Sequence, residues 1–169
     1  MKTRIRSRWI GLGACAMIMS CVAAHAHAAD ANRACALVTA AELKTVLGDE
    51  VTLKPLGGTG GVAICNGTTS KASVLLRVAT KRQGSGDAAK AGIEAARKMG
   101  AQVDVKTFGP ITCSTMVPPE SLAAHGFNTT CSITKGTSLA AIEITAKTKA
   151  DMVSIEGLKT LAEKMAGRL

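Results

Sequence analysis

The chain has 169 residues, of which 21 are Lys or Arg and 12 are Asp or Glu, so its formal net charge is +9. It contains one Trp, two Phe and no Tyr. Proteins that bind single-stranded nucleic acid or sugars commonly stack these ligands on aromatic side chains, so this composition argues against both classes of partner. We therefore expect no nucleic-acid partner.

The first 28 residues have the three-part layout of a secretory signal peptide. A basic start, MKTRIRSR, precedes the apolar run WIGLGACAMIMSCVAA, and Ala26-His27-Ala28 supplies a small-x-small cleavage site. The apolar run is too short and wrongly flanked for a membrane span. We predict a signal peptide over 1–28 and one exported domain over 29–169, periplasmic or secreted. Its removal lowers the basic count from 21 to 17 against 12 acidic residues, a net charge of +5.

A second interpretation of the leader is lipidation. The stretch Ile18-Met19-Ser20-Cys21 resembles a lipoprotein box, which would make Cys21 the acylated N-terminus. Met19 fits that pattern poorly, and a good Ala-x-Ala site follows directly. Soluble export is favoured, and a lipid-anchored structural protein is the alternative, with membrane contact only in that case.

Residues 35–48, CALVTAAELKTVLG, carry the clearest local signal for a helix. Thr39 and Glu42 form a Thr-x-x-Glu capping box, in which each side chain binds an amide of the first turn. Val38 and Leu43 stand at the positions of a hydrophobic staple, and Gly48 suits the left-handed residue after a helix end. We predict a helix of about nine residues from Thr39 onwards.

Glycines dominate the next segment, GGTGG at 57–61. The residues from Gly58 to Ala63 fit the dinucleotide pattern G-x-G-x-x-(G/A), which works only where a helix begins at the glycines. The sequence that follows, VAICNGTT, is β-branched and then turn-like. We therefore expect a loop between two strands and no nucleotide cofactor.

The remaining segments alternate between strand and helix patterns. We predict strands at 51–56, 61–65, 73–80, 102–108, 127–134 and 138–147, helices at 87–100 and 153–169, and an irregular segment at 113–126. Two hairpins arise from the pairs 61–65 with 73–80 and 127–134 with 138–147. The expected fold class is α+β, a mostly antiparallel sheet of two hairpins plus short strands, one face of which is covered by about three helices.

Four cysteines remain after the leader: Cys35, Cys65, Cys113 and Cys131. An even count in an exported chain indicates two disulfides, although three pairings are possible. We favour the two sequence-local pairs, Cys35 with Cys65 and Cys113 with Cys131. No Cys-x-x-Cys motif occurs, which argues against a thiol-redox role.

The opening Cys35-x-Leu-Val-Thr-x-x-Glu-Leu43, with the second cysteine at Cys65 before a strand, resembles a group of small bacterial envelope proteins and lipoproteins of unknown function. Their wider fold is similar to that of the PsbP-type extrinsic photosystem proteins, a helix-covered antiparallel sheet. The group often has an aromatic residue after the second cysteine, where this chain has Asn66-Gly67. The resemblance implies a fold and a location but no activity.

Catalytic and metal-binding groups are sparse. His125 is the one histidine after the leader, and three serines lie near it in sequence, Ser114, Ser121 and Ser132. A small hydrolase that uses His125 and one of these serines is an alternative function, but no nucleophile motif surrounds them. A single histidine and paired cysteines also leave no ligand set for a metal.

Basic residues gather in the predicted strand 73–80, in the predicted helix 87–100 and in the loop between them: Arg77, Lys81, Arg82, Lys90, Arg97 and Lys98. If strand 73–80 and helix 87–100 are neighbours, these residues form a basic face for an anionic envelope component or an acidic protein partner. The leading hypothesis is therefore an exported binding or accessory module without catalytic activity.

Overall fold

The computed structural model of the chain describes residues 33–56, 58, 60–80 and 85–169. The predicted signal peptide, its cleavage site and Cys21 lie outside the described residues. The elements follow one another as α2 (Ala40–Leu47), β1 (Thr52–Pro55), β2 (Ala63–Thr68), β3 (Ala72–Thr80), α3 (Ser85–Lys98), β4 (Gln102–Phe108), β5 (Ile111–Val117), the 3-10 helix η1 (Glu120–His125), β6 (Phe127–Lys135), β7 (Ser138–Ala146), the 3-10 helix η2 (Lys149–Asp151) and α4 (Ile155–Arg168).

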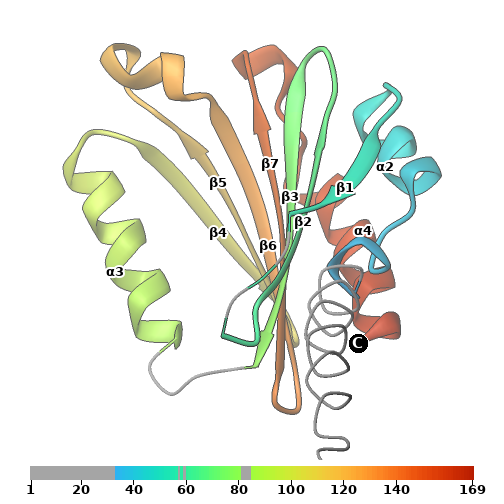
Figure 1. Ribbon diagram of the computed structural model, residues 1–169. Helices are drawn as coiled ribbons and strands as arrows, with labels where there is room; N and C mark the ends of the chain where they lie inside the picture. The colour runs from blue at the N-terminus through green and yellow to red at the C-terminus, as the bar shows by residue number, and fades with distance from the viewer. Residues whose placement is uncertain (1–32, 57, 59, 81–84) are drawn as a thin grey trace, which may run out of the picture.

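The strands form one antiparallel sheet in the order β1-β2-β3-β7-β6-β5-β4 (Figure 1). The predicted hairpins are β2–β3 and β6–β7. Strands β3 and β7 pair along their whole length, from Ala72 opposite Ala146 to Thr80 opposite Ser138. This pairing joins the first three strands of the chain to the last four. The predicted α+β class and its antiparallel sheet are confirmed.

Helix α2 forms as its sequence predicts. The backbone amide of Glu42 donates to the Thr39 hydroxyl, and the amide of Thr39 donates to the Glu42 carboxylate, which completes the capping box. Gly48 has a φ of 71°, the left-handed conformation that ends the helix. Val38 and Leu43 are both buried beneath this first turn.

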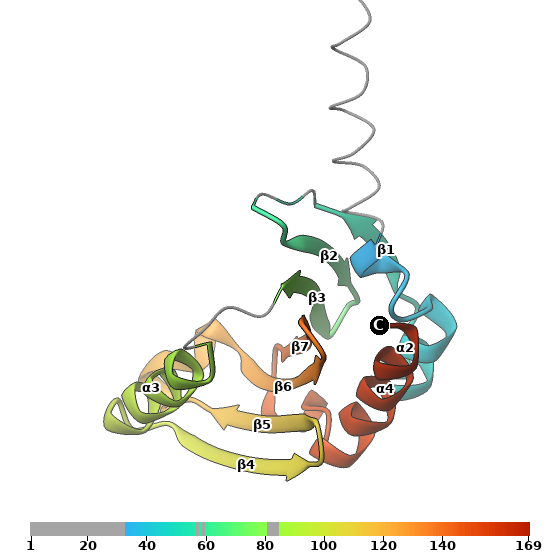
Figure 2. The same cartoon turned by 90° about the horizontal axis from the view of Figure 1, so that it is seen from below.

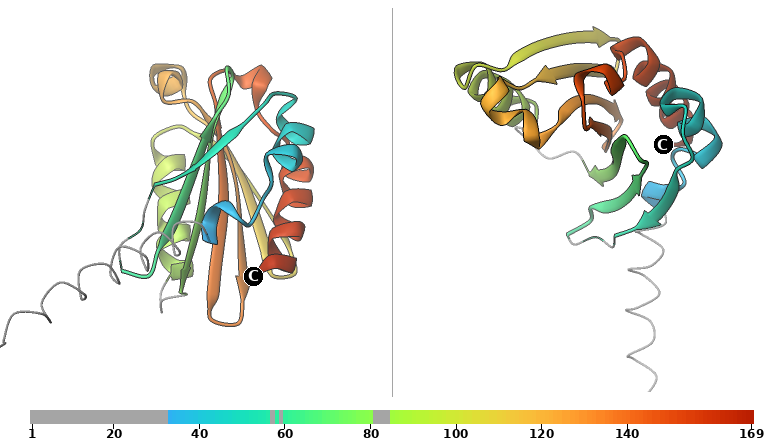
Figure 3. Two further views of the ribbon diagram at one scale, coloured as in Figure 1. Left: turned by 45° about the vertical axis from the view of Figure 1, so that its right-hand side comes forward. Right: turned by 90° about the horizontal axis from the view of Figure 1, so that it is seen from above.

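Alternate residues of the strands point to a buried face, which we call the inner face. Helices α2 and α4 cover it side by side (Figures 1 and 3). Helix α4 buries the apolar stripe that its sequence predicts, namely Ile155, Leu158, Leu161, Ala162 and Met165. The strands contribute the other half of the core, chiefly Val74, Leu76, Val78, Ile133, Ile142 and Ile144.

Helix α3 lies on the opposite side of the sheet, the outer face (Figure 2). The prediction that the helices cover one face is therefore wrong. Helix α3 takes this position because of its composition. It is rich in alanine, and Ile93 is its one large apolar residue. Among the residues of this helix whose burial is described, 87–98, only Ala96 is buried. A helix with so little apolar area cannot contribute to the main core, so it lies loosely on the polar side of the sheet.

The prediction of an irregular segment over 113–126 is also partly wrong. Its first residues belong to β5, which follows β4 through a two-residue turn, Gly109-Pro110, with Phe108 opposite Ile111. Gly109 has a φ of 59°, as a hairpin turn with glycine at its first central position requires. The Pro118-Pro119 pair that suggested irregularity ends the strand instead of preventing it.

Both predicted disulfides are confirmed. Cys35 and Cys65 bind the segment before α2 to β2, with their Cα atoms 5.1 Å apart. Cys113 and Cys131 stand directly opposite each other on β5 and β6, with a Cα–Cα distance of 4.0 Å. Each disulfide lies on the inner face, where Cys65, Cys113 and Cys131 are fully buried.

The glycine run connects β1 to β2, and the backbone amide of Leu56 donates to the carbonyl of Ile64 across this turn at 3.0 Å. A Cβ on Gly58 would lie 1.7 Å from the carbonyl oxygen of Val62, so only glycine fits there. The next element is strand β2, which begins at Ala63. The expected loop between strands is therefore confirmed, and the described residues place no helix N-terminus at these glycines.

Candidate functional site

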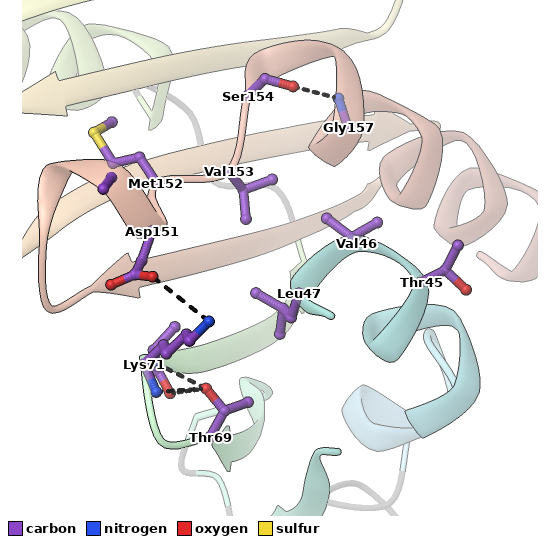
Figure 4. Close-up of a pocket in the computed structure, with 12 residues that line it drawn as sticks. Thr45, Val46, Leu47, Thr69, Lys71, Asp151, Met152, Val153, Ser154 and Gly157 are labelled. Carbon is purple, nitrogen blue, oxygen red and sulfur yellow. Dashed lines mark hydrogen bonds and ion pairs between the residues drawn. The ribbon is translucent and has the colours of Figure 1, made fainter. Parts of the chain in front are cut away.

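The largest hollow described, which we call the Lys71 pocket, has a volume of about 560 Å³ (Figure 4). It lies between the end of α2, the turn that joins β2 to β3, and the segment that leads into α4. Val46 and Leu47 extend into it from α2, and Met152 and Val153 line the opposite side. Its size would suit a small ligand.

The polar groups of the Lys71 pocket already bind one another. The Lys71 ammonium lies 4.0 Å from a carboxylate oxygen of Asp151, whose other oxygen accepts from the Thr148 hydroxyl. The Thr69 hydroxyl accepts from the amides of Lys71 and Ala72 and shapes the turn. Ser154 caps α4 by accepting from the amide of Gly157. These groups serve the local structure, so few remain for a ligand.

A second hollow, the α3 cleft, separates α3 from the outer face of the sheet and has a volume of about 260 Å³. One side consists of a strip of small and apolar residues on α3, and the other consists of outward-pointing residues of four strands. The α3 side is Ala89, Gly92, Ile93 and Ala96, and the sheet side is Val103, Ser114, Met116, Asn128, Thr130 and Glu143.

The space at Gly92 shows how far α3 stands from the sheet. Gly92 lines the cleft, yet a Cβ built on it would meet no atom within 4 Å. A helix packed normally against a sheet would place such a Cβ in van der Waals contact. On the sheet side, the hydroxyls of Ser114 and Thr130 make no hydrogen bond with any described residue. The cleft therefore combines open space with unused hydrogen-bonding groups.

An apolar hollow of about 210 Å³, the Met99 hollow, lies beside the cleft. Ala96, Met116 and Asn128 line both spaces, so the two hollows are neighbours. The Met99 hollow adds Met99, Pro118, Pro119 and Leu122, and the Met99 side chain is 62% exposed. The exposed Met99 side chain adds to the apolar lining of this hollow.

The predicted basic face is only partly described, because Lys81 and Arg82 lie outside the described residues. Arg77 points to the outer face and forms a 3.0 Å ion pair with Glu143, which lines the α3 cleft. Arg97 donates to the carbonyl of Val103 at 3.2 Å.

The other two basic residues of that face, Lys90 and Lys98, are exposed on α3. Lys90 and Arg97 lie two turns apart, so they share the side of the helix that faces β4. Arg77 and Arg97 therefore bind two residues that line the cleft, Glu143 and Val103. Sequence reasoning missed the cleft itself, because its walls come from distant parts of the chain.

His125 ends η1 and lies at the Met99 hollow and at a neighbouring hollow that also contains Ser73. Of the serines considered for catalysis, Ser114 lies in the α3 cleft, and Ser132 donates to the carbonyl of Thr112. No hydrogen bond joins His125 to a serine among the described residues. The hydrolase alternative stays a prediction.

Comparison with protein-family models, with curated proteins and with solved structures finds no match for this chain. The resemblance to small envelope proteins and to the PsbP-type fold therefore stays an expectation. Within the described parts of the chain, no cluster of His, Cys, Asp or Glu could hold a metal ion. None of the described helices has the length and apolar character needed to cross a membrane.

Proposed function

We propose that the protein is a non-catalytic binding module exported to the cell envelope, and that its ligand occupies the α3 cleft. The two disulfides support the exported location, because disulfides persist mainly in oxidising compartments. The observation that carries the binding function is the open space at Gly92, between a helix and the sheet face that it ought to cover.

The chemistry of the cleft favours an amphiphile with an apolar chain and an anionic head group. The chain would lie against Ile93, Met116 and the Met99 hollow. The head group would accept hydrogen bonds from Ser114 and Thr130 and approach the cations Arg77 and Arg97, which bind residues that line the cleft. Glu143 does not repel such an anion strongly, because Arg77 neutralises it. An anionic lipid or cell-wall component has this combination of groups.

A fluorescence titration with anilinonaphthalene sulfonate, an anionic amphiphile, tests the proposal. The variant Gly92→Leu fills the open space of the cleft and should weaken binding of the probe about tenfold or more. Lys90→Glu should weaken the same probe but leave an uncharged apolar dye, Nile red, unaffected, because it changes only the charge beside the cleft.

The matched control is Gly167→Leu. Gly167 is also an exposed helical glycine with nothing within 4 Å of its Cβ position, but it lies on α4, away from the cleft. Both variants replace an exposed helical glycine with leucine, so a loss of binding in Gly92→Leu alone assigns the site to the cleft. Equal binding by both variants would remove the cleft as the ligand site.

A further inference from the structure

Strand β4 forms an open edge of the sheet. It pairs with β5 on one side, and no described strand lies on its other side. The opposite edge, β1, has four residues and ends in Pro55, a short and interrupted strand of the kind that resists further pairing. Strand β4 has seven residues and no proline, and most of them are exposed. Of the two edges, only β4 offers a template for another strand.

The direction of the free backbone groups follows from the pairing of β5. The 4.0 Å Cα–Cα distance between Cys113 and Cys131 is that of a pair without mutual hydrogen bonds, so the backbone groups of Cys113 point to β4. Its partner there is Lys106. Lys106 and alternate residues therefore bind β5, whereas Val103, Val105 and Thr107 direct their amides and carbonyls outwards. The hydrogen bond from Arg97 to the Val103 carbonyl agrees with this direction.

We propose that β4 pairs with β4 of a second copy of this chain, antiparallel, about a two-fold axis at Val105. This pairing joins two sheets into one across the interface, with the same surface used by both copies. It also places Val105, which is 36% exposed, beside its own counterpart and reduces the exposure of both side chains to water.

Charge selects this register. With the axis at Val105, Asp104 of each copy stands opposite Lys106 of the other, which gives two complementary pairs on one face of the joined sheet. An axis at Val103 would place Asp104 opposite Gln102, and an axis at Thr107 would place Lys106 opposite Phe108. Neither alternative pairs opposite charges.

The surroundings of β4 permit the contact. Lys106 forms a 2.8 Å ion pair with Glu156 of α4, but both side chains are about half exposed or more, at 46% and 66%, so Lys106 can reach a second carboxylate. The Val103 carbonyl has two lone pairs, so Arg97 can remain bound while the second copy donates to the same oxygen.

Sedimentation velocity on the disulfide-bonded protein, over a series of concentrations, measures the self-association. The wild-type protein should pass from monomer to dimer as its concentration rises from micromolar to millimolar. Val105→Pro removes an amide that points away from β5 and should weaken dimerisation about tenfold or more without unfolding the sheet. Val105→Thr keeps the amide and should still dimerise, and thermal unfolding checks that both variants fold.

A charge exchange tests the register itself. Lys106→Glu and Asp104→Lys each place like charges opposite one another in a homodimer, so each variant alone should be monomeric. Mixed in equal amounts, they should form a heterodimer, because Asp104 and Glu from one copy then face two lysines of the other. A wild-type protein that stays monomeric throughout, a dimer unaffected by Val105→Pro, or a mixture that stays monomeric would each overturn the proposal.

Discussion

The contact between Glu42 and Arg168 is the main polar link between α2 and α4. The Arg168 guanidinium donates to both carboxylate oxygens of Glu42, at 2.7 and 2.8 Å, and also to the carbonyl of Leu37. Lys164 lies 3.4 Å from the same carboxylate, and the amide of Thr39 donates to it. Glu42 therefore closes the capping box and binds the end of α4 at once, with only 15% of its side chain exposed.

Arg168→Met keeps the apolar stem of the side chain and removes the guanidinium. Hydrogen bonds to charged groups contribute about 1.5–3 kcal/mol, and solvent reduces this where a partner is 36% exposed, as Arg168 is. We expect the free energy of unfolding to fall by about 1–2 kcal/mol at pH 7. The matched control is Lys44→Met, which breaks an ion pair with Glu50 whose side chains are 54% and 78% exposed, so solvent screens it and its loss should cost much less than that of Arg168→Met.

The same contact predicts a dependence on pH. The hydrogen bond from Arg168 is the main cause that holds the pKa of Glu42 well below its usual range, and the contact with Thr39 adds to it. A lowered native pKa stabilises the fold fully above the ordinary value of 4.5, and this contribution is lost as the pH falls towards the native value. The difference between the wild type and Arg168→Met should therefore persist from pH 7 to about 5 and shrink in stronger acid.

Urea unfolding followed by far-ultraviolet circular dichroism measures both effects, with the disulfides intact. This probe suits the chain because its one Trp lies within the predicted signal peptide. Glu42→Gln keeps the acceptor of the capping box, so in a double-mutant cycle Arg168→Met should cost little once Glu42 has been neutralised. A cost equal to that of Lys44→Met, or a difference that is unchanged at pH 3, would refute the reasoning.

Three further variants test the core. Thr129→Val removes a buried hydroxyl that donates to the Val153 carbonyl at 2.6 Å, and should lower the free energy of unfolding by about 1–2 kcal/mol in urea; no change would mean that this bond contributes nothing. Gly126→Ala forces a left-handed φ of 88° on a side chain and sets its Cβ 2.5 Å from a β7 methyl, so we expect a loss of more than about 2 kcal/mol and a clear fall in Tm. The double variant Cys113→Ala with Cys131→Ala opens an 18-residue loop and should cost about 3 kcal/mol by calorimetry, whereas an unchanged Tm would show that strand pairing alone suffices.

Local signals made parts of the fold predictable. Helix α2 depends on residues within one turn of each other, Thr39 and Glu42, so its start can be seen in the sequence. The C-terminal helix has a large apolar stripe that needs a partner, and this stripe indicates burial before any neighbour is known. The residues that determine these two elements are close together in the sequence, so the sequence alone indicates them.

The errors share a different cause. Strand β5 has hydroxyl-bearing residues on its outer face and is followed by two prolines. Its alternation of apolar and polar residues was therefore a weaker indication of a strand than the prolines were of irregular structure. Helix α3 has no apolar stripe strong enough to indicate a side of the sheet.

The α3 cleft could not be predicted, because Ser114, Thr130 and Glu143 meet only through the order of β5, β6 and β7. Periodicity shows that each of these residues points away from the core. It does not show which strands are neighbours.

The positions of the disulfides leave one junction of the fold without a covalent link. Cys35–Cys65 lies within the part of the chain that ends with β3, and Cys113–Cys131 lies within the part that begins with β4. The ladder between β3 and β7 and the contacts between α2 and α4 join the two parts, and all of these contacts are noncovalent. An oxidised molecule can therefore open there into two cross-linked halves connected by α3. Two open molecules can then exchange halves and close again as an intertwined pair, with every cysteine still in its native bond.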